Sequence, residues 1–200
     1  MRELLIVWLT FAMNMMHPPH QTSFIAEAKE SYVQEDARRR EIVETIIDRS
    51  FDSSTVPLFM GEKARSASAM FLLVKMYAES GFRRDVHLGL AREKYANTGL
   101  NDSGRSWCLG QIMLGVKTVP WNGQWSTESA TSTEEGWTGR DLVGDTNKCV
   151  IATLHVLKRS FGACKQLPPD QRLAAYAAGK CDSKQGQKIS EIRFRAYRHW

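Results

Sequence analysis

A glutamate at the end of a predicted helix is the residue best placed for acid–base chemistry. The segment YAESGF at residues 77–82 puts Glu79 after an apolar helical stripe and just before Gly81, where a helix tends to end. Apolar neighbours desolvate a carboxyl group, which raises its pKa and lets it hold a proton near neutral pH. Such a group can protonate a poor leaving group, such as a glycosidic oxygen. From spacing alone, a solvent-facing glutamate that ends a helix is the commoner interpretation.

Hydrophobic spacing predicts the elements that must position this glutamate. Helices are expected over residues 24–49, 62–79, 145–162 and 168–179, and Asp145 is a good N-cap for the third. Between residues 88 and 139 the chain is rich in glycine, serine, threonine and asparagine, which favours an irregular segment with at most a small β-element. The pattern therefore predicts a mainly α domain with a long central loop.

The N-terminal residues 1–20 form a separate apolar arm in this interpretation, followed by a helical segment over residues 21–60. The run LLIVWLTFAM at residues 4–13 is too short for a membrane span and is about the length of a signal-peptide core. No small-x-small cleavage site follows it. A poor signal peptide, an uncleaved anchor and an amphipathic arm all stay open, and no stable membrane span is expected.

The net charge of +5 favours an anionic partner, which could be nucleic acid, a membrane surface or an anionic wall polymer. Short basic clusters occur at residues 38–40 and at Arg193, Arg195 and Arg198. Neither cluster contains a base-reading motif, and short basic runs are usually solvated helix faces. We therefore expect no nucleic-acid partner.

The four cysteines, Cys108, Cys149, Cys164 and Cys181, contain no CxxC pair. The histidines His87, His155 and His199 stand at no zinc-like spacing from them, so we expect no metal site. An even count without metal spacing favours two disulfides and hence an oxidising compartment, although four buried thiols are the alternative. Four cysteines allow three pairings, and the residues alone do not choose among them.

Three segments, in the same order along the chain, resemble motifs of the soluble lytic transglycosylase and goose-type lysozyme superfamily. ESGF at residues 79–82 is similar to the "ES-x-F" block, SWCLGQI at residues 106–112 to "S-x-GLMQI", and AYAAG at residues 175–179 to "AYNAG". Residues 145–157 resemble the helix between the last two blocks. Cys108, Gly110 and Ala177 depart from the motifs, whereas Glu79, Gln111 and Tyr176 are retained. The segments that contain the cysteines resemble a cysteine-bearing subgroup of this superfamily, which is found in bacteria and their phages.

The resemblance implies that residues 61–200 form a lysozyme-like domain that cleaves peptidoglycan without a cofactor. Glu79 would protonate the bond between MurNAc and GlcNAc and then act as a base towards the muramoyl C6 hydroxyl, which closes a 1,6-anhydro ring. Gln111 would bind the sugar or its N-acetyl group, Tyr176 would orient the Glu79 carboxyl group or the substrate, and Ser80 would hold polar groups of the substrate. The aromatic residues that could form apolar floors for sugar rings are Trp107, Trp121, Trp125 and Trp137, at least one of which we expect in the core.

A hydrolysing glycosidase normally has a second catalytic carboxylate. The available residues, Asp85, Asp102, Asp141 and Asp145, carry no recognisable signature, which favours the transglycosylase. A hydrolysing muramidase and a non-catalytic glycan-binding or structural descendant stay open. We expect a monomer that acts on glycan strands in the periplasm or outside the cell, is encoded by a bacterium or a phage, and carries a weak export signal.

The resemblance also implies a disulfide pairing. It brings the blocks that contain Cys108 and Cys181 to the same groove, which favours a bridge between these two residues. Cys149 and Cys164 are then left as the second pair by elimination, although a straight helix would hold them about 20 Å apart at 1.5 Å per residue.

Overall fold

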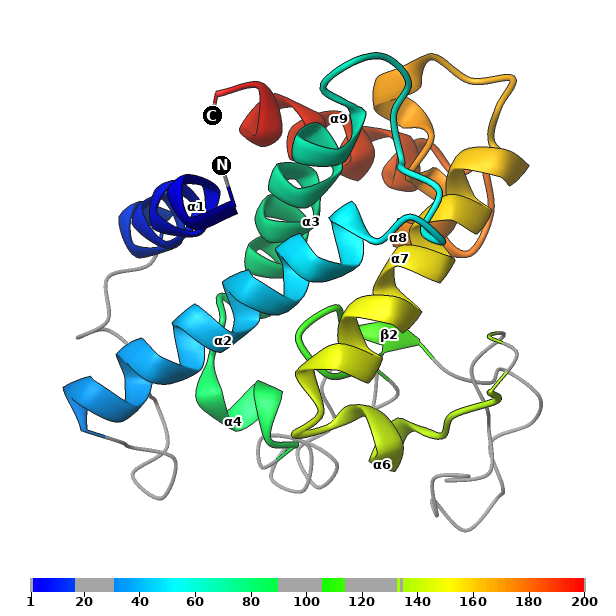
Figure 1. Ribbon diagram of the computed structural model, residues 1–200. Coiled ribbons are helices and arrows are strands. Elements are labelled where there is room, and N and C mark those ends of the chain that lie inside the picture. Colours follow the sequence, from blue (N-terminus) through cyan, green and yellow to red (C-terminus); the bar gives the residue numbers. More distant parts are fainter. Residues whose placement is uncertain (1, 17–30, 90–105, 114–132, 134, 200) are drawn as a thin grey trace, which may run out of the picture.

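The structure is a computed structural model that describes residues 2–16, 31–89, 106–113, 133 and 135–199, and it is mainly helical (Figure 1). The long helices are α1 (Arg2–Met16), α2 (Tyr32–Phe51), α3 (Ala64–Ser80), α7 (Thr146–Ala163) and α9 (Lys184–Arg198). The short ones are α4 (Arg84–His87), α6 (Gly139–Leu142), α8 (Ala174–Ala178) and the 3-10 turn η3 (Pro169–Gln171). Strands β1 (Ser106–Trp107) and β2 (Ile112–Met113) pair antiparallel. The predicted mainly α class with a small β-element is confirmed.

Helix α3 is the central helix of this arrangement. Every residue from 68 to 76 is buried, and α1, α2 and α9 all pack against the helix (Figure 1). The sequence pattern indicated a single apolar stripe, whereas the helix is enclosed on several sides. Polar side chains in its middle are therefore removed from water together with the apolar ones.

The ends of the helices that flank the site follow local capping rules. Helix α3 ends at Gly81, which has a left-handed φ of 59° and donates its backbone N–H to the Tyr77 carbonyl. Helix α7 begins after Asp145, whose carboxylate accepts the backbone N–H of Lys148 at 2.9 Å. Both boundaries agree with the sequence-based expectation.

The apolar run near the N-terminus lies in helix α1. One face of α1 enters the core through Ile6, Leu9, Ala12 and Met13. The other face exposes Leu4, Val7, Trp8, Phe11 and Met15. Where the structure describes the chain, each helix is too short or too polar to cross a lipid bilayer.

Helix α9 was not expected from the sequence, and an aromatic cluster holds it against α3. The rings of the cluster belong to Phe59, Phe71, Phe161, Phe194 and Tyr197. The centroids of Phe71 on α3 and Phe194 on α9 lie 4.9 Å apart. Such pairs contribute about 0.5–1.5 kcal/mol beyond the area they bury. This packing fixes where the polar face of α9 meets the end of α3.

The cysteines form two disulfides, but the predicted pairing is wrong. Cys108 bonds to Cys149, with 6.0 Å between their Cα atoms, and Cys164 bonds to Cys181, with 5.4 Å between theirs. Cys149 lies in the first turn of α7 and Cys164 follows its last residue, so the helix itself separates them. The block containing Cys108 packs against the start of α7, and the chain after α8 returns to the end of α7. The predicted Cys108–Cys181 bridge is wrong, and so is the Cys149–Cys164 bridge that followed from it by elimination.

Candidate active site

Glu79 lies in the last turn of α3, and two cationic side chains contact its carboxylate. Lys75 Nζ, one turn earlier on the same helix, donates to Glu79 Oε1, and Arg193 Nη2 from α9 contacts the same oxygen. The Glu79 side chain is 15% exposed, so its carboxylate is near the surface but not open to bulk water. These surroundings differ from the apolar environment that the sequence suggested.

Lys75 is the most deeply buried member of this group, with its side chain 1% exposed. Its ammonium group lies 3.8 Å from the centroid of the Tyr176 ring, which is a cation–π contact. The pKa of Lys75 is lowered to about 7, mainly because the side chain is buried; Glu79 opposes this change, and the charge of Arg193 contributes to it. Lysine is rarely this buried unless it is paired, and here its partner is the candidate catalytic carboxylate.

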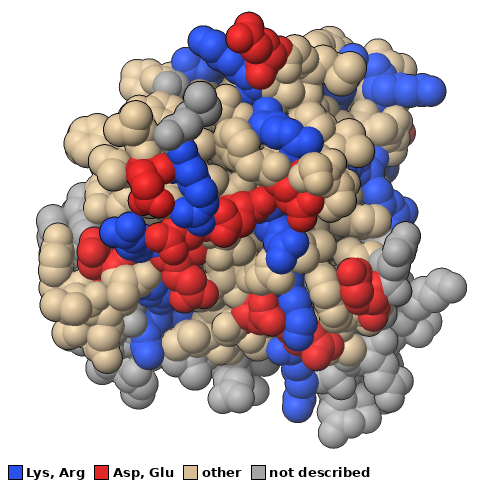
Figure 2. All heavy atoms as spheres, viewed as in Figure 1, with Lys and Arg blue, Asp and Glu red and all other residues tan. Residues whose placement is uncertain are grey.

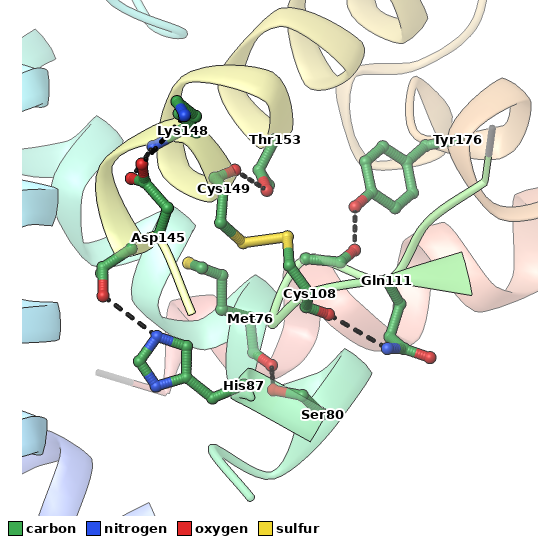
Figure 3. The surroundings of a disulfide bond; sticks show 12 residues. Met76, Ser80, His87, Cys108, Gln111, Asp145, Lys148, Cys149, Thr153 and Tyr176 are labelled. Atoms are coloured by element: carbon green, nitrogen blue, oxygen red, sulfur yellow. Dashed lines mark hydrogen bonds and ion pairs between the residues drawn. A yellow bond between two sulfur atoms is a disulfide. The ribbon is translucent and has the colours of Figure 1, made fainter. Parts of the chain in front are cut away.

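Tyr176 links the third motif to the second. Its hydroxyl donates to the backbone carbonyl of Gly110 (Figure 3). Its own backbone N–H donates to Ser160 Oγ at 3.0 Å. Burial raises the pKa of Tyr176 well above its usual value, so the hydroxyl keeps its proton and remains a donor. The structure therefore places Tyr176 near Glu79 through Lys75, but its hydroxyl holds the Gln111 block and not the carboxylate.

Gln111 lies in a tight turn between β1 and β2. Its backbone N–H and its side-chain Nε2 both donate to the Cys108 carbonyl at 3.0 Å (Figure 3). These bonds fix the orientation of the side-chain amide. Its oxygen has no partner within the described residues, so it can accept a hydrogen bond from a ligand.

The segments that contain Glu79 and Gln111 also include residues with strained backbone angles. The non-glycine residues with left-handed φ in the described chain are Phe82 at 54°, Cys108 at 52° and Gln111 at 48°. Phe82 follows the end of α3, and the other two lie in the turn that carries Gln111. Strained non-glycine residues persist where the surrounding structure holds them, and they are frequent at functional sites. The Cys108–Cys149 disulfide and the Tyr176 hydroxyl are two restraints that hold the turn.

The turn after Glu79 is held by hydrogen bonds within the protein. The Ser80 hydroxyl is buried, donates to the Met76 carbonyl at 2.7 Å and accepts the Phe82 N–H at 3.2 Å. Arg38 Nη2 from α2 donates to the Phe82 carbonyl at 2.9 Å. The Ser80 hydroxyl thus ends the helix, and this geometry does not support its predicted contact with substrate.

A buried histidine connects the next short helix to the rest of the domain. His87 Nε2 on α4 lies 3.0 Å from Thr146 Oγ1 (Figure 3). Thr146 Oγ1 in turn donates to Glu41 on α2 at 2.9 Å. Burial lowers the pKa of His87 to about 4, so the imidazole is neutral at physiological pH. This contact ties α2, α4 and the start of α7 together beside the site.

The aspartates considered as second catalytic carboxylates are occupied by structural contacts. Asp85 is fully buried and paired with Arg83, Asp141 accepts from the backbone N–H and hydroxyl of Thr138, and Asp145 caps α7. Asp102 lies outside the described residues.

Of the tryptophans considered as floors for sugar rings, Trp107 is a core residue, 7% exposed, and its ring packs against Gly139. Trp137 is partly buried and packs against the same core. Trp121 and Trp125 lie outside the described residues.

Sequence reasoning missed Lys75 and Arg193 as members of the site. Lys75 is the one charged residue in the otherwise apolar run AMFLLVKM at residues 69–76, which was a usable signal for a buried charge. Arg193 was interpreted only as part of a basic run. Its helix has a recognisable N-cap, because Ser183 Oγ accepts the backbone N–H of Gly186 at 3.1 Å.

No match was found for this chain among protein-family models, curated proteins or solved structures. Nor do three or more histidine, cysteine, aspartate or glutamate side chains gather as metal ligands anywhere in the described part of the chain. The interpretation of the site therefore depends on its own geometry and on the motifs.

Proposed function

We propose that this protein is a peptidoglycan lytic transglycosylase with a lysozyme-like fold, and that Glu79 is its catalytic acid and base. One observation carries the proposal. A continuous series of contacts runs from Glu79 to Lys75, from Lys75 to the Tyr176 ring, and from the Tyr176 hydroxyl to Gly110. The three motifs, which lie between residues 79 and 179 of the chain, are therefore joined by contacts that begin at one carboxylate, which supports a shared chemical role.

In the proposed reaction, Glu79 gives a proton to the glycosidic oxygen between MurNAc and GlcNAc, and the C–O bond breaks. Its carboxylate then takes the proton of the muramoyl C6 hydroxyl, whose oxygen attacks C1 and closes the 1,6-anhydro ring. The amide oxygen of Gln111, which has no partner among the described residues, could accept an N-acetyl N–H. Because Asp85, Asp141 and Asp145 make structural contacts elsewhere, the substrate's own hydroxyl is a better candidate for the nucleophile than a water activated by a second carboxylate.

Charge and disulfides support the proposed setting. Acidic and basic side chains are interspersed on the face shown in Figure 2, without the broad basic area that a nucleic-acid binder usually presents. Two disulfides are typical of an oxidising compartment, so we place the action of the protein in the periplasm or outside the cell, as a monomer on glycan strands.

One observation favours a non-catalytic, glycan-binding descendant as the second candidate. The Glu79 carboxylate contacts two cations, which favour its ionised form over the protonated form that a general acid needs. Under this alternative the ion pairs would be structural, and the protein would bind glycan without cleaving it.

The substitution Glu79→Gln separates the two candidates. The amide has the shape of the carboxyl group but cannot transfer the proton, so we expect solubilisation of purified murein to fall by at least about 10²-fold while glycan binding is retained. Glu62→Gln, at an exposed position just before the same helix, is the matched control and should retain full activity. Unchanged cleavage in Glu79→Gln would contradict the assignment of Glu79.

A further inference from the structure

The proposed reaction requires a protonated Glu79, whereas the contacts of its carboxylate favour the ionised form. Lys75 and Arg193 both contact Oε1, and positive charges next to a carboxyl group favour its ionised form. A general acid must carry a proton when the substrate is in place. A neighbouring group that can release a proton to Glu79 would meet this requirement.

Of the two cations on Oε1, only one can release a proton. The guanidinium of Arg193 stays protonated in proteins, so it can stabilise the carboxylate but cannot protonate it. The ammonium of Lys75 is in direct contact with Oε1, and a buried lysine can lose its proton. Its location on the same face of α3, four residues before Glu79, keeps the two groups in contact.

The groups that face Lys75 come from three helices. Glu79 is on α3, the Tyr176 ring is on α8, and Arg193 is on α9. Burial and the positive charge of Arg193 both lower the pKa of Lys75, to about 7, while Glu79 acts in the opposite direction. Near neutral pH the amine and ammonium forms are thus close in free energy, and a modest change of environment can move the proton.

We propose that Lys75 is a positioning residue that stores the proton of the proposed transglycosylase reaction and gives it to Glu79 when a glycan strand covers the pair. This inference rests on the proposed function. A bound strand removes water from the partly exposed carboxylate, which disfavours both charges of the ion pair and favours the neutral amine and carboxylic acid. Arg193 retains its charge throughout and stabilises the carboxylate when Glu79 gives the proton away.

The proton balance closes over one catalytic cycle. An Nζ–H bond of Lys75 breaks and an O–H bond forms on Glu79. The carboxylic acid then protonates the glycosidic oxygen as the C1–O bond breaks. Finally the C6 hydroxyl loses its proton to the Glu79 carboxylate while its oxygen bonds to C1, and the proton returns to Lys75. No water and no further reactant is consumed.

Two variants test this role through activity. Lys75→Arg keeps the positive charge next to Glu79 but cannot release a proton, so we expect murein cleavage to fall by about 10²- to 10⁴-fold with glycan binding retained. Lys75→Met removes both charge and proton and should be at least as slow. Lys63, exposed just before the first residue of α3, is the matched control position, and the same substitutions there should leave cleavage unchanged. Wild-type rates in Lys75→Arg would overturn the proposal.

The wild-type protein provides a test that does not depend on the folding of a variant. The pH dependence of kcat/KM reports the pKa values of essential groups in the free enzyme. We expect kcat/KM to fall as the pH rises through about 7, because Lys75 then has no proton to give. Activity that persists undiminished above pH 9 would contradict the storage role.

A titration of the isotope-labelled Lys75 side chain by NMR separates this inference from the proposed function. We expect the amine to titrate near pH 7 in the wild type. In Glu79→Gln it should titrate at a lower pH, because the carboxylate that favours the charged form is gone. An amine that titrates near its usual value would overturn the inference, whatever the activity. Titration near pH 7 in a protein that leaves murein uncut would support the proton coupling and contradict the transglycosylase assignment.

Discussion

At the scale of single residues, Gly110 shows how closely the Gln111 turn approaches helix α7. A Cβ atom on Gly110 would lie 2.1 Å from Thr153 Oγ1 and 3.1 Å from Thr153 Cβ. The Thr153 hydroxyl is itself fixed, since it donates to the Cys149 carbonyl at 2.7 Å (Figure 3). The turn that carries Gln111 can therefore reach α7 only with glycine at this position. This explains why glycine stands where the resembling motif has methionine.

We expect Gly110→Ala to lower the free energy of unfolding by about 1–3 kcal/mol, the usual cost of overpacking a well-packed contact. Thr153→Ala in the same chain should recover part of the loss, because it removes the nearest atom. Gly162→Ala is the control, because Gly162 lies on α7, as Thr153 does, and an added Cβ there would have open space around it. This substitution should be neutral or slightly stabilising. Urea unfolding of the four proteins measures these differences. Equal stability of Gly110→Ala and the wild type would mean that the turn lies farther from α7.

The sequence could point to Glu79, Gln111 and Tyr176 because each lies in a short local motif. It could not give the electrostatic environment of Glu79, because Arg193 follows 114 residues later and meets it only through the packing of α9 on α3. The role of Lys75 could have been predicted from the sequence, because it is a single charge inside an apolar run. Its burial, however, depends on α3 being enclosed by three other helices.

At the scale of elements, helix α7 supports the site through its two ends. Cys149 in its first turn is bonded to Cys108 in the Gln111 turn, and Cys164 after its last turn is bonded to Cys181 beyond α8. The Cys108–Cys149 bridge thus restrains the second motif, and the Cys164–Cys181 bridge restrains the segment that follows the third motif. Local signals predicted the ends of α3 and α7, because Gly81 and Asp145 act within one turn. The pairing of cysteines depends on the path of the whole chain, which local signals do not contain.

The two bridges should differ in their effects. They enclose sequence separations of 41 and 17 residues, so the chain-entropy model gives about 4 kcal/mol for Cys108–Cys149 and about 3 kcal/mol for Cys164–Cys181. We expect Cys108→Ser with Cys149→Ser to lose more stability and more murein cleavage than Cys164→Ser with Cys181→Ser, because only the first pair restrains the Gln111 turn. Urea unfolding and cleavage assays of both double variants provide the comparison. A larger loss of cleavage in the second variant would contradict this assignment.

At the scale of the whole molecule, helices from both halves of the chain converge on the end of α3. Arg38 on α2 holds the turn after Glu79, and His87 joins α4 to the start of α7. Helices α8 and α9 bring Tyr176 and Arg193 to the end of α3. Amphipathic patterning predicted the mainly helical class. It did not predict α9, whose mostly polar sequence packs against the aromatic cluster through Phe194.

The products of a murein digest test the central claim most directly. Purified murein is incubated with the protein in water labelled with heavy oxygen, and the soluble fragments are analysed by mass spectrometry. Because the C6 hydroxyl of the substrate is the proposed nucleophile, we expect 1,6-anhydromuramoyl ends without label. Reducing ends that contain the heavy oxygen would show hydrolysis, and a digest without soluble fragments would show no cleavage. Either result would contradict the assignment of this protein as a lytic transglycosylase.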